Sequence, residues 1–117
     1  MSAEWRYMIV WEFHVRAGME HAFEAAYGPD GEWARFFKHD EGYVGTELNR
    51  DVKDPRCYLT LDFWTSEKSY ENFHSRWSAE YQKIDQMCEA MTERELEVGK
   101  FERRRKKVMF WERKGWI

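Results

Sequence analysis

His74 is the most informative of the few residues in this chain that could perform proton chemistry. It lies in segment 66–92, "SEKSYENFHSRWSAEYQKIDQMCEAMT", where apolar residues recur at steps of three and four. This spacing predicts one long helix with His74 on its aromatic side. An imidazole there could take a proton from a phenol near neutral pH. The alternative is a core histidine hydrogen-bonded to a backbone carbonyl or a carboxylate.

Aromatic residues that could surround a planar ligand are abundant. They make up 18% of the 117 residues and include seven tryptophans. Such rings pack a core, cover an interface or hold a planar molecule by stacking. The pocket candidates are Trp11, Tyr27, Trp33, Phe37, Phe73, Trp77 and Tyr81. Tyr27 and Tyr81 are preferred because each hydroxyl needs a hydrogen-bond partner. The alternative for most of these rings is plain core packing.

The elements that must position these residues follow from periodicity and from breaks in it. "GPDG" at 28–31 divides the first helical region, since Pro29 breaks a helix and Asp30 can cap a new one. The predicted order is strand 8–15, helical segments 19–27 and from 30 onward, a turn followed by a strand within 41–51, strand 57–64, helix 66–92 and strand 93–102. This βαββαβ order is typical of a ferredoxin-like α+β domain, with helices on one face of an antiparallel sheet.

Alternation along the strands assigns residues to the two faces of this sheet. We place three apolar sets toward the helices. They are Ile9, Trp11, Phe13 and Val15 of strand 8–15, Leu59, Leu61 and Phe63 of strand 57–64, and Leu96 and Val98 of strand 93–102. The opposite face then carries Tyr58, Trp64 and several polar residues: Glu12, His14, Glu47, Asp62 and Glu95 or Glu97. These carboxylates and histidine could bind a divalent metal. We favour a polar subunit interface and predict no metal site.

Composition limits the classes of partner. The net charge of −3 argues against nucleic acid, although "RRRKK" at 103–107 could contact phosphate; we interpret it as a solvated run. The longest apolar run, "YMIVW", is too short to span a membrane. "MSAEWRY" lacks the apolar region of a signal peptide, and two cysteines make no disulfide framework, so we expect a cytoplasmic protein. We divide the chain into a domain at 1–102 and a basic, aromatic tail at 103–117 that docks on the domain or on a partner subunit.

Three segments resemble the antibiotic biosynthesis monooxygenase family. They are "MIVWEFHVRAGMEHAFEAAYG", "GYVGTELNRD" and "YLTLDFWTSEKSYENF", and the resemblance extends over about residues 7–102. It implies a dimeric α+β barrel, in which two sheets pack face to face, with a pocket between each sheet and its helices. Some relatives oxygenate aromatic polyketides or quinols without metal or flavin.

Another branch of the same superfamily binds and degrades haem. Aligning on Trp64-x-Ser66, the residues of that branch (an Asn, a Trp and a His) fall at Trp11, Phe73 and Lys83 here. None of the three matches, so haem chemistry ranks low.

The sequence therefore predicts an enzyme, a small homodimer formed through the sheet face. It would oxygenate a planar aromatic or quinol-type small molecule without a bound cofactor, with His74 handling the proton. The alternative is a non-catalytic small-molecule-binding or dimerisation module, because a fold alone does not fix a function.

Overall fold

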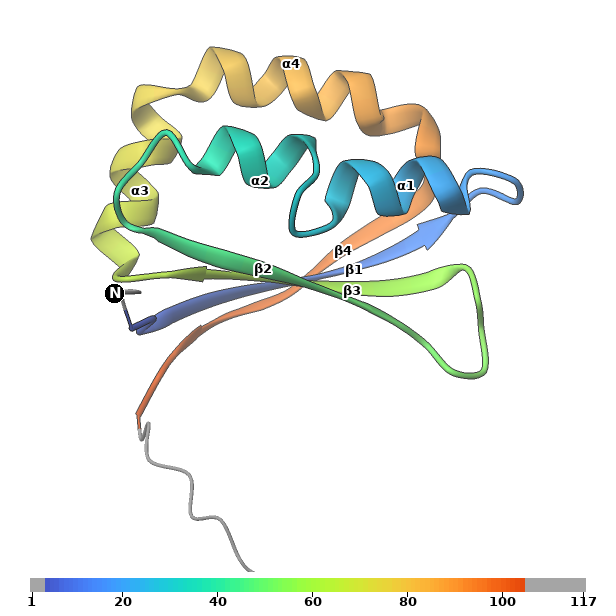
Figure 1. Cartoon of the computed structure of the whole chain (residues 1–117), viewed down its shortest axis with the longest axis horizontal. Helices are drawn as coiled ribbons and strands as arrows, with labels where there is room; N and C mark the ends of the chain where they lie inside the picture. The colour runs from blue at the N-terminus through green and yellow to red at the C-terminus, as the bar shows by residue number, and fades with distance from the viewer. Residues whose placement is uncertain (1–3, 105–117) are drawn as a thin grey trace, which may run out of the picture.

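The structure, a computed structural model, describes residues 4–104 and shows an α+β fold (Figure 1). Its elements are β1 (Tyr7–Val15), α1 (Glu20–Tyr27), α2 (Glu32–Phe37), β2 (Tyr43–Arg50), β3 (Cys57–Trp64), α3 (Glu67–Arg76), α4 (Ser78–Cys88), the short 3₁₀ helix η1 (Glu89–Met91) and β4 (Thr92–Glu102). The strands form one antiparallel sheet in the order β2-β3-β1-β4. The helices all cover one of its faces. The predicted ferredoxin-like arrangement is confirmed.

The predicted single helix over 66–92 is wrong at one point, because the helix breaks at Trp77. Its backbone leaves helical geometry, with φ −114° and ψ 26°. The indole packs against the His39 ring at a centroid distance of 5.1 Å. In Figure 1, α3 rises from the sheet and α4 turns to run above α2 and α1. The break therefore brings Tyr81 over α2, where its ring lies 5.0 Å from that of Trp33.

The predicted faces of β3 are reversed. Tyr58, Thr60 and Trp64 are the buried residues of this strand, whereas Leu59 is 36% exposed. The cause is the pairing with β1, which sets Tyr58 opposite Phe13 and Trp64 opposite Tyr7, so that these residues share the helix-covered face. The alternation along β3 divided its residues correctly between two faces, but it could not show which face the helices cover.

The same correction applies to β4. Leu96 and Val98 are 45% and 49% exposed, and Leu96 pairs with Glu12 on the open face of the sheet. Glu95 instead pairs with Phe13 and therefore lies on the helix-covered face. A bulge where Val10 and Trp11 meet β4 shifts the register by one residue, which the sequence pattern did not reveal.

Aromatic rings form most of the core between the sheet and the helices. Trp64 is fully buried, and its ring lies 5.5 Å from Phe37 and 5.4 Å from Phe73. Toward the other end of the sheet, Phe23 contacts Phe13 and Tyr58 at 5.2 and 4.9 Å. Core packing thus uses many of the rings that the sequence offered as pocket candidates.

The remaining predictions concern a membrane span and the C-terminal tail, and most of the tail lies outside the described residues. No helix within residues 4–104 is long and apolar enough to cross a membrane. The Arg103 guanidinium lies over the Trp5 ring at 4.4 Å. The predicted docking of the tail concerns mainly residues 105–117, which lie outside the described residues.

The position of Trp64 predicts its effect on stability. We expect Trp64→Ala to lower the free energy of unfolding by about 3–5 kcal/mol, because it leaves a cavity among packed rings. Val52→Ala is the control, since Val52 is 99% exposed and the change should stay within about 0.5 kcal/mol. Urea denaturation measures both, and similar small losses for the two variants would contradict the core described here.

Candidate functional site

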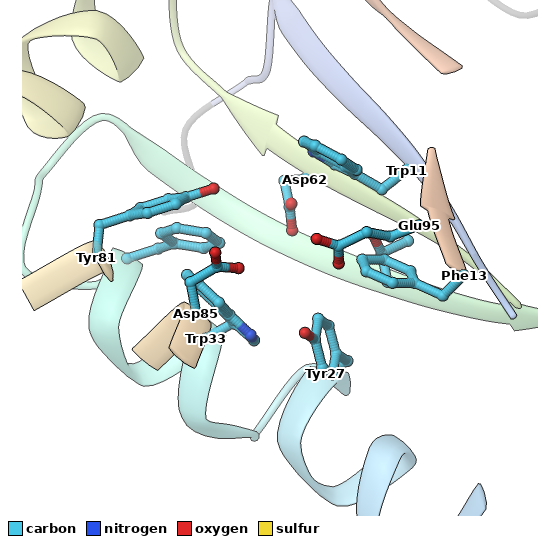
Figure 2. Close-up of a pocket in the computed structure, with 10 residues that line it drawn as sticks. Trp11, Phe13, Tyr27, Trp33, Asp62, Tyr81, Asp85 and Glu95 are labelled. Atoms are coloured by element: carbon cyan, nitrogen blue, oxygen red, sulfur yellow. The ribbon is translucent and has the colours of Figure 1, made fainter. Parts of the chain in front are cut away.

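A partly open pocket lies between the helix-covered face of the sheet and the helices (Figure 2). Its cavity volume is about 50 Å³, and its mouth is open to solvent. Its walls come from helices α1, α2 and α4 and from strands β1, β3 and β4. The lining residues are Trp11, Phe13, Tyr27, Trp33, Phe37, Thr60, Asp62, Tyr81, Asp85 and Glu95.

Six of these residues are aromatic, and their rings form walls suited to a flat ligand. Trp33 lies at the centre, with ring centroids 5.0 Å from Tyr81, 5.8 Å from Phe37 and 6.0 Å from Tyr27. Trp11 and Phe13 form a second, nearly parallel pair on β1, 6.2 Å apart at 26°. Concave sites with aromatic walls and a few polar groups are typical of small-molecule sites.

The polar groups of the pocket are mainly carboxylates. Asp62 on β3, Asp85 on α4 and Glu95 on β4 point toward one another in Figure 2. Among the described residues that line this pocket, none is Lys, Arg or His. The site therefore concentrates negative charge beside aromatic rings.

Asp62 has the most specific surroundings of the three carboxylates. The Thr46 hydroxyl donates a hydrogen bond of 2.7 Å to Oδ1 of Asp62. Since that uses the only hydroxyl hydrogen of Thr46, the Tyr43 hydroxyl, 2.6 Å away, is the donor to Thr46. Removal from water raises the pKa of Asp62 to about 6, although the hydrogen bond from Thr46 opposes this rise. A carboxyl group with such a pKa can exchange a proton near neutral pH.

The pKa values of Glu95 and Tyr81, which also line the pocket, are raised as well. Burial, with the nearby charges of Asp85 and Glu89, raises the pKa of Glu95. Burial raises the pKa of Tyr81, and the charges of Asp85, Asp62 and Glu95 add to the rise. All three carboxylates therefore disfavour ionisation of Tyr81, and they would disfavour any further negative charge in this pocket.

Five of the seven predicted pocket rings line the pocket: Trp11, Tyr27, Trp33, Phe37 and Tyr81. Phe73 is buried in the core, and Trp77 packs on His39 instead. His74 also lies outside the lining, with its ring 4.5 Å from Tyr81 and 5.7 Å from Tyr70. The structure therefore places His74 behind Tyr81.

Sequence reasoning missed five lining residues: Phe13, Thr60, Asp62, Asp85 and Glu95. Asp62 and Thr60 were assigned to the wrong face with the rest of their strand. Asp85 carried a usable signal, because it follows Tyr81 by four residues and so lies on the same side of a helix. Glu95 carried none, because its face depends on the register with β1.

The polar residues considered as metal ligands fall into separate groups. Asp62 and Glu95 lie in the pocket, whereas Glu12 and His14 lie on the open face, joined by a 2.7 Å contact between Nε2 and a carboxylate oxygen. Cys57 pairs with His14 across the sheet, and the ligand atoms of Glu12, His14 and Cys57 lie within 4.8 Å of one another. These three could hold a transition metal such as zinc. Burial raises the pKa of the Cys57 thiol, so metal binding would have to displace its proton.

The fold agrees with the family that sequence comparison identifies. Residues 6–85 match the family described as antibiotic biosynthesis monooxygenase, so the chain belongs to that family. No curated protein matches the chain.

Solved structures share the fold at low sequence identity. SnoaB, described as a cofactor-independent oxygenase from Streptomyces nogalater, is 19% identical, with a TM-score of 0.70 over 88% of this chain and 97% of its own. A conserved protein from Methanosarcina mazei Go1 is 12% identical, with a TM-score of 0.64 over 86% and 94% of the two chains. PA3566 from Pseudomonas aeruginosa is also 12% identical, with a TM-score of 0.61 over 87% and 97%.

The raised pKa of Asp62 predicts how stability depends on pH. The folded-state pKa of about 6 exceeds the usual 3.8, so folding binds a proton in this range and the ionised carboxylate lowers stability above it. We expect Asp62→Asn to be more stable than the wild type at pH 8 by roughly 1–3 kcal/mol, with the difference disappearing below about pH 4. Urea denaturation at several pH values measures this, and a constant difference across pH would contradict the assignment.

Proposed function

We propose that this protein is an oxygenase that converts a planar aromatic or quinol-type small molecule in the pocket without a tightly bound cofactor. The observation that carries the proposal is the aromatic pocket with the half-buried Asp62 carboxylate in its wall. Membership of a monooxygenase family supports the reaction type. The shared fold with SnoaB, described as a cofactor-independent oxygenase, supports the absence of a cofactor.

The chemistry assigned to the protein is limited to orientation, water exclusion and proton transfer. In a substrate with a ring CH₂ beside a phenol or ketone, loss of one proton gives an electron-rich anion. Reaction with dioxygen then turns the CH₂ into a carbonyl: one oxygen atom enters the product and the other leaves as water with the two hydrogens. The substrate supplies all the electrons. The rings of Trp11, Trp33 and Tyr81 would hold the plane of the substrate.

Asp62 is the proton acceptor that the geometry supports best. It lines the pocket, and one of its oxygens, Oδ1, is held by Thr46. The sequence suggested His74 for this role. Its ring packs against Tyr81, so His74 could act on a ligand only through Tyr81. Asp62 lines the pocket and His74 does not, which supports Asp62 over His74 as the proton acceptor.

Oxygen uptake by metal-stripped protein with a panel of quinols and anthrones, amine-substituted members included, tests the proposal. We expect uptake above the uncatalysed rate, and a loss of about 10²-fold or more in Asp62→Asn. His74→Gln should retain most of the activity, and Glu93→Gln is the matched control, because Glu93 pairs with Arg56 at the surface.

The two variants separate the candidates for the proton acceptor. Loss of uptake in His74→Gln with full activity in Asp62→Asn would reverse the two roles. Absence of uptake with every compound would favour the non-catalytic binding module.

The proposal includes a homodimer formed through the open face of the sheet, and a cytoplasmic location remains part of the same expectation. Strand pairing gathers apolar residues on this face: Met8, Val10, Leu59, Leu61, Phe63, Leu96 and Phe101. Three of them, Leu59, Leu96 and Phe101, are 36–45% exposed in the single chain. A second copy that packs sheet against sheet would bury them, and exposed apolar patches of this kind often mark interfaces.

A charge placed on the open face tests the dimer. We expect Leu96→Glu to convert a dimer into a monomer, because the interface would bury an unpaired carboxylate. Val52→Glu, on an exposed turn, is the control and should remain dimeric. Sedimentation equilibrium gives the mass, and a wild-type monomer or an unchanged dimer in Leu96→Glu would contradict the proposed interface.

A further inference from the structure

The charge of the pocket restricts the substrate more narrowly than its shape does. We propose that the aromatic substrate carries a positive charge, as a protonated amine or a cationic nitrogen heterocycle, which binds among Asp62, Asp85 and Glu95. This inference rests on the proposed function, in that it names the chemical class of ligand for the same pocket.

The three carboxylates have no ion-pair partner among residues 4–104. Within residues 4–104, six ion pairs engage Glu12, Glu24, Glu32, Glu93, Glu97 and Glu102, and none engages a carboxylate of the pocket. Three separate elements bring these groups to one space, where Figure 2 shows their oxygens directed toward each other. Among the described residues, the lining has no basic side chain that could neutralise them.

The groups around the carboxylates add negative rather than positive charge. Asp85 and Glu89 both act on Glu95, and Asp62, Asp85 and Glu95 all act on the Tyr81 hydroxyl. Each of these interactions disfavours ionisation of the group concerned. A ligand cation would have the opposite effect on these groups, because a positive charge favours the ionised form of every carboxyl group near it.

The aromatic rings of the pocket favour a cation independently of the carboxylates. Trp11, Trp33 and Tyr81 line the same space, and the faces of Trp and Tyr rings attract cations. An aromatic cation would therefore gain from the walls as well as from the acids. A neutral ring would gain only burial and stacking, and an anionic one would be repelled.

The same charge distribution bears on the proposed reaction. Removal of a proton from a neutral substrate would create an anion beside Asp85 and Glu95, which the pocket opposes. A substrate that already carries a positive nitrogen becomes neutral overall when it loses that proton. The cation thus explains how an acidic pocket could permit an electron-rich intermediate to form.

Three naphthalenes that differ only in one substituent test the inference: 1-(aminomethyl)naphthalene, 1-(hydroxymethyl)naphthalene and 1-naphthoate. Isothermal titration calorimetry with the full chain at pH 7.5 and low salt gives their affinities. We expect the amine to bind about tenfold or more tighter than the alcohol, and the carboxylate to bind most weakly.

Isosteric variants identify the charges responsible without altering Asp62. Asp85→Asn combined with Glu95→Gln should weaken the amine by about tenfold and leave the alcohol nearly unchanged. The matched control is Glu93→Gln, which removes one carboxylate outside the pocket and should change neither affinity.

The outcomes separate this inference from the proposed function. If the alcohol binds as tightly as the amine, or the carboxylate binds best, the inference is overturned while an aromatic-binding pocket stands. An amine preference that survives in the double variant overturns it as well, because the charge would then be recognised elsewhere. If none of the three compounds binds, the aromatic pocket itself fails, and with it the proposed function.

Discussion

The burial of Trp64 is the constraint on which the site depends. Its ring packs against Phe37 of α2 and Phe73 of α3, so the end of β3 is fixed with this side chain toward the helices. Because side chains alternate along a strand, Asp62 and Thr60 must then face the same way. A core interaction that involves no polar atom of the pocket thus places a carboxylate in the pocket wall.

The pocket retains features that a core selected only for stability would avoid. Asp62 remains ionisable in partly dehydrated surroundings, and Glu95 lies near two other acids. The hydrogen bonds from Tyr43 to Thr46 and from Thr46 to Asp62 offset part of this unfavourable free energy and orient the carboxylate. Groups held against their own solvation preference mark functional sites more often than structural ones, since structure alone does not require them.

The sequence predicted the order of the elements and the family, because both depend on local periodicity and on segments such as "YLTLDFWTSEKSYENF". It predicted five of the pocket rings, because rings near a helix–sheet boundary face inward from either element. It could not predict Asp62 or Glu95, whose orientation is set by pairing with β1, an interaction between distant segments. Nor did it indicate the break at Trp77, where neither glycine nor proline marks the change of direction.

A crystal structure of the protein with 1-(aminomethyl)naphthalene bound would test the pocket most directly. We expect the naphthalene ring between Trp11 and Trp33, with the ammonium group within hydrogen-bond distance of a carboxylate from Asp62, Asp85 or Glu95. A ring bound at another surface while this pocket stays empty would overturn the proposed site. So would a ring in this pocket whose ammonium group points away from all three carboxylates.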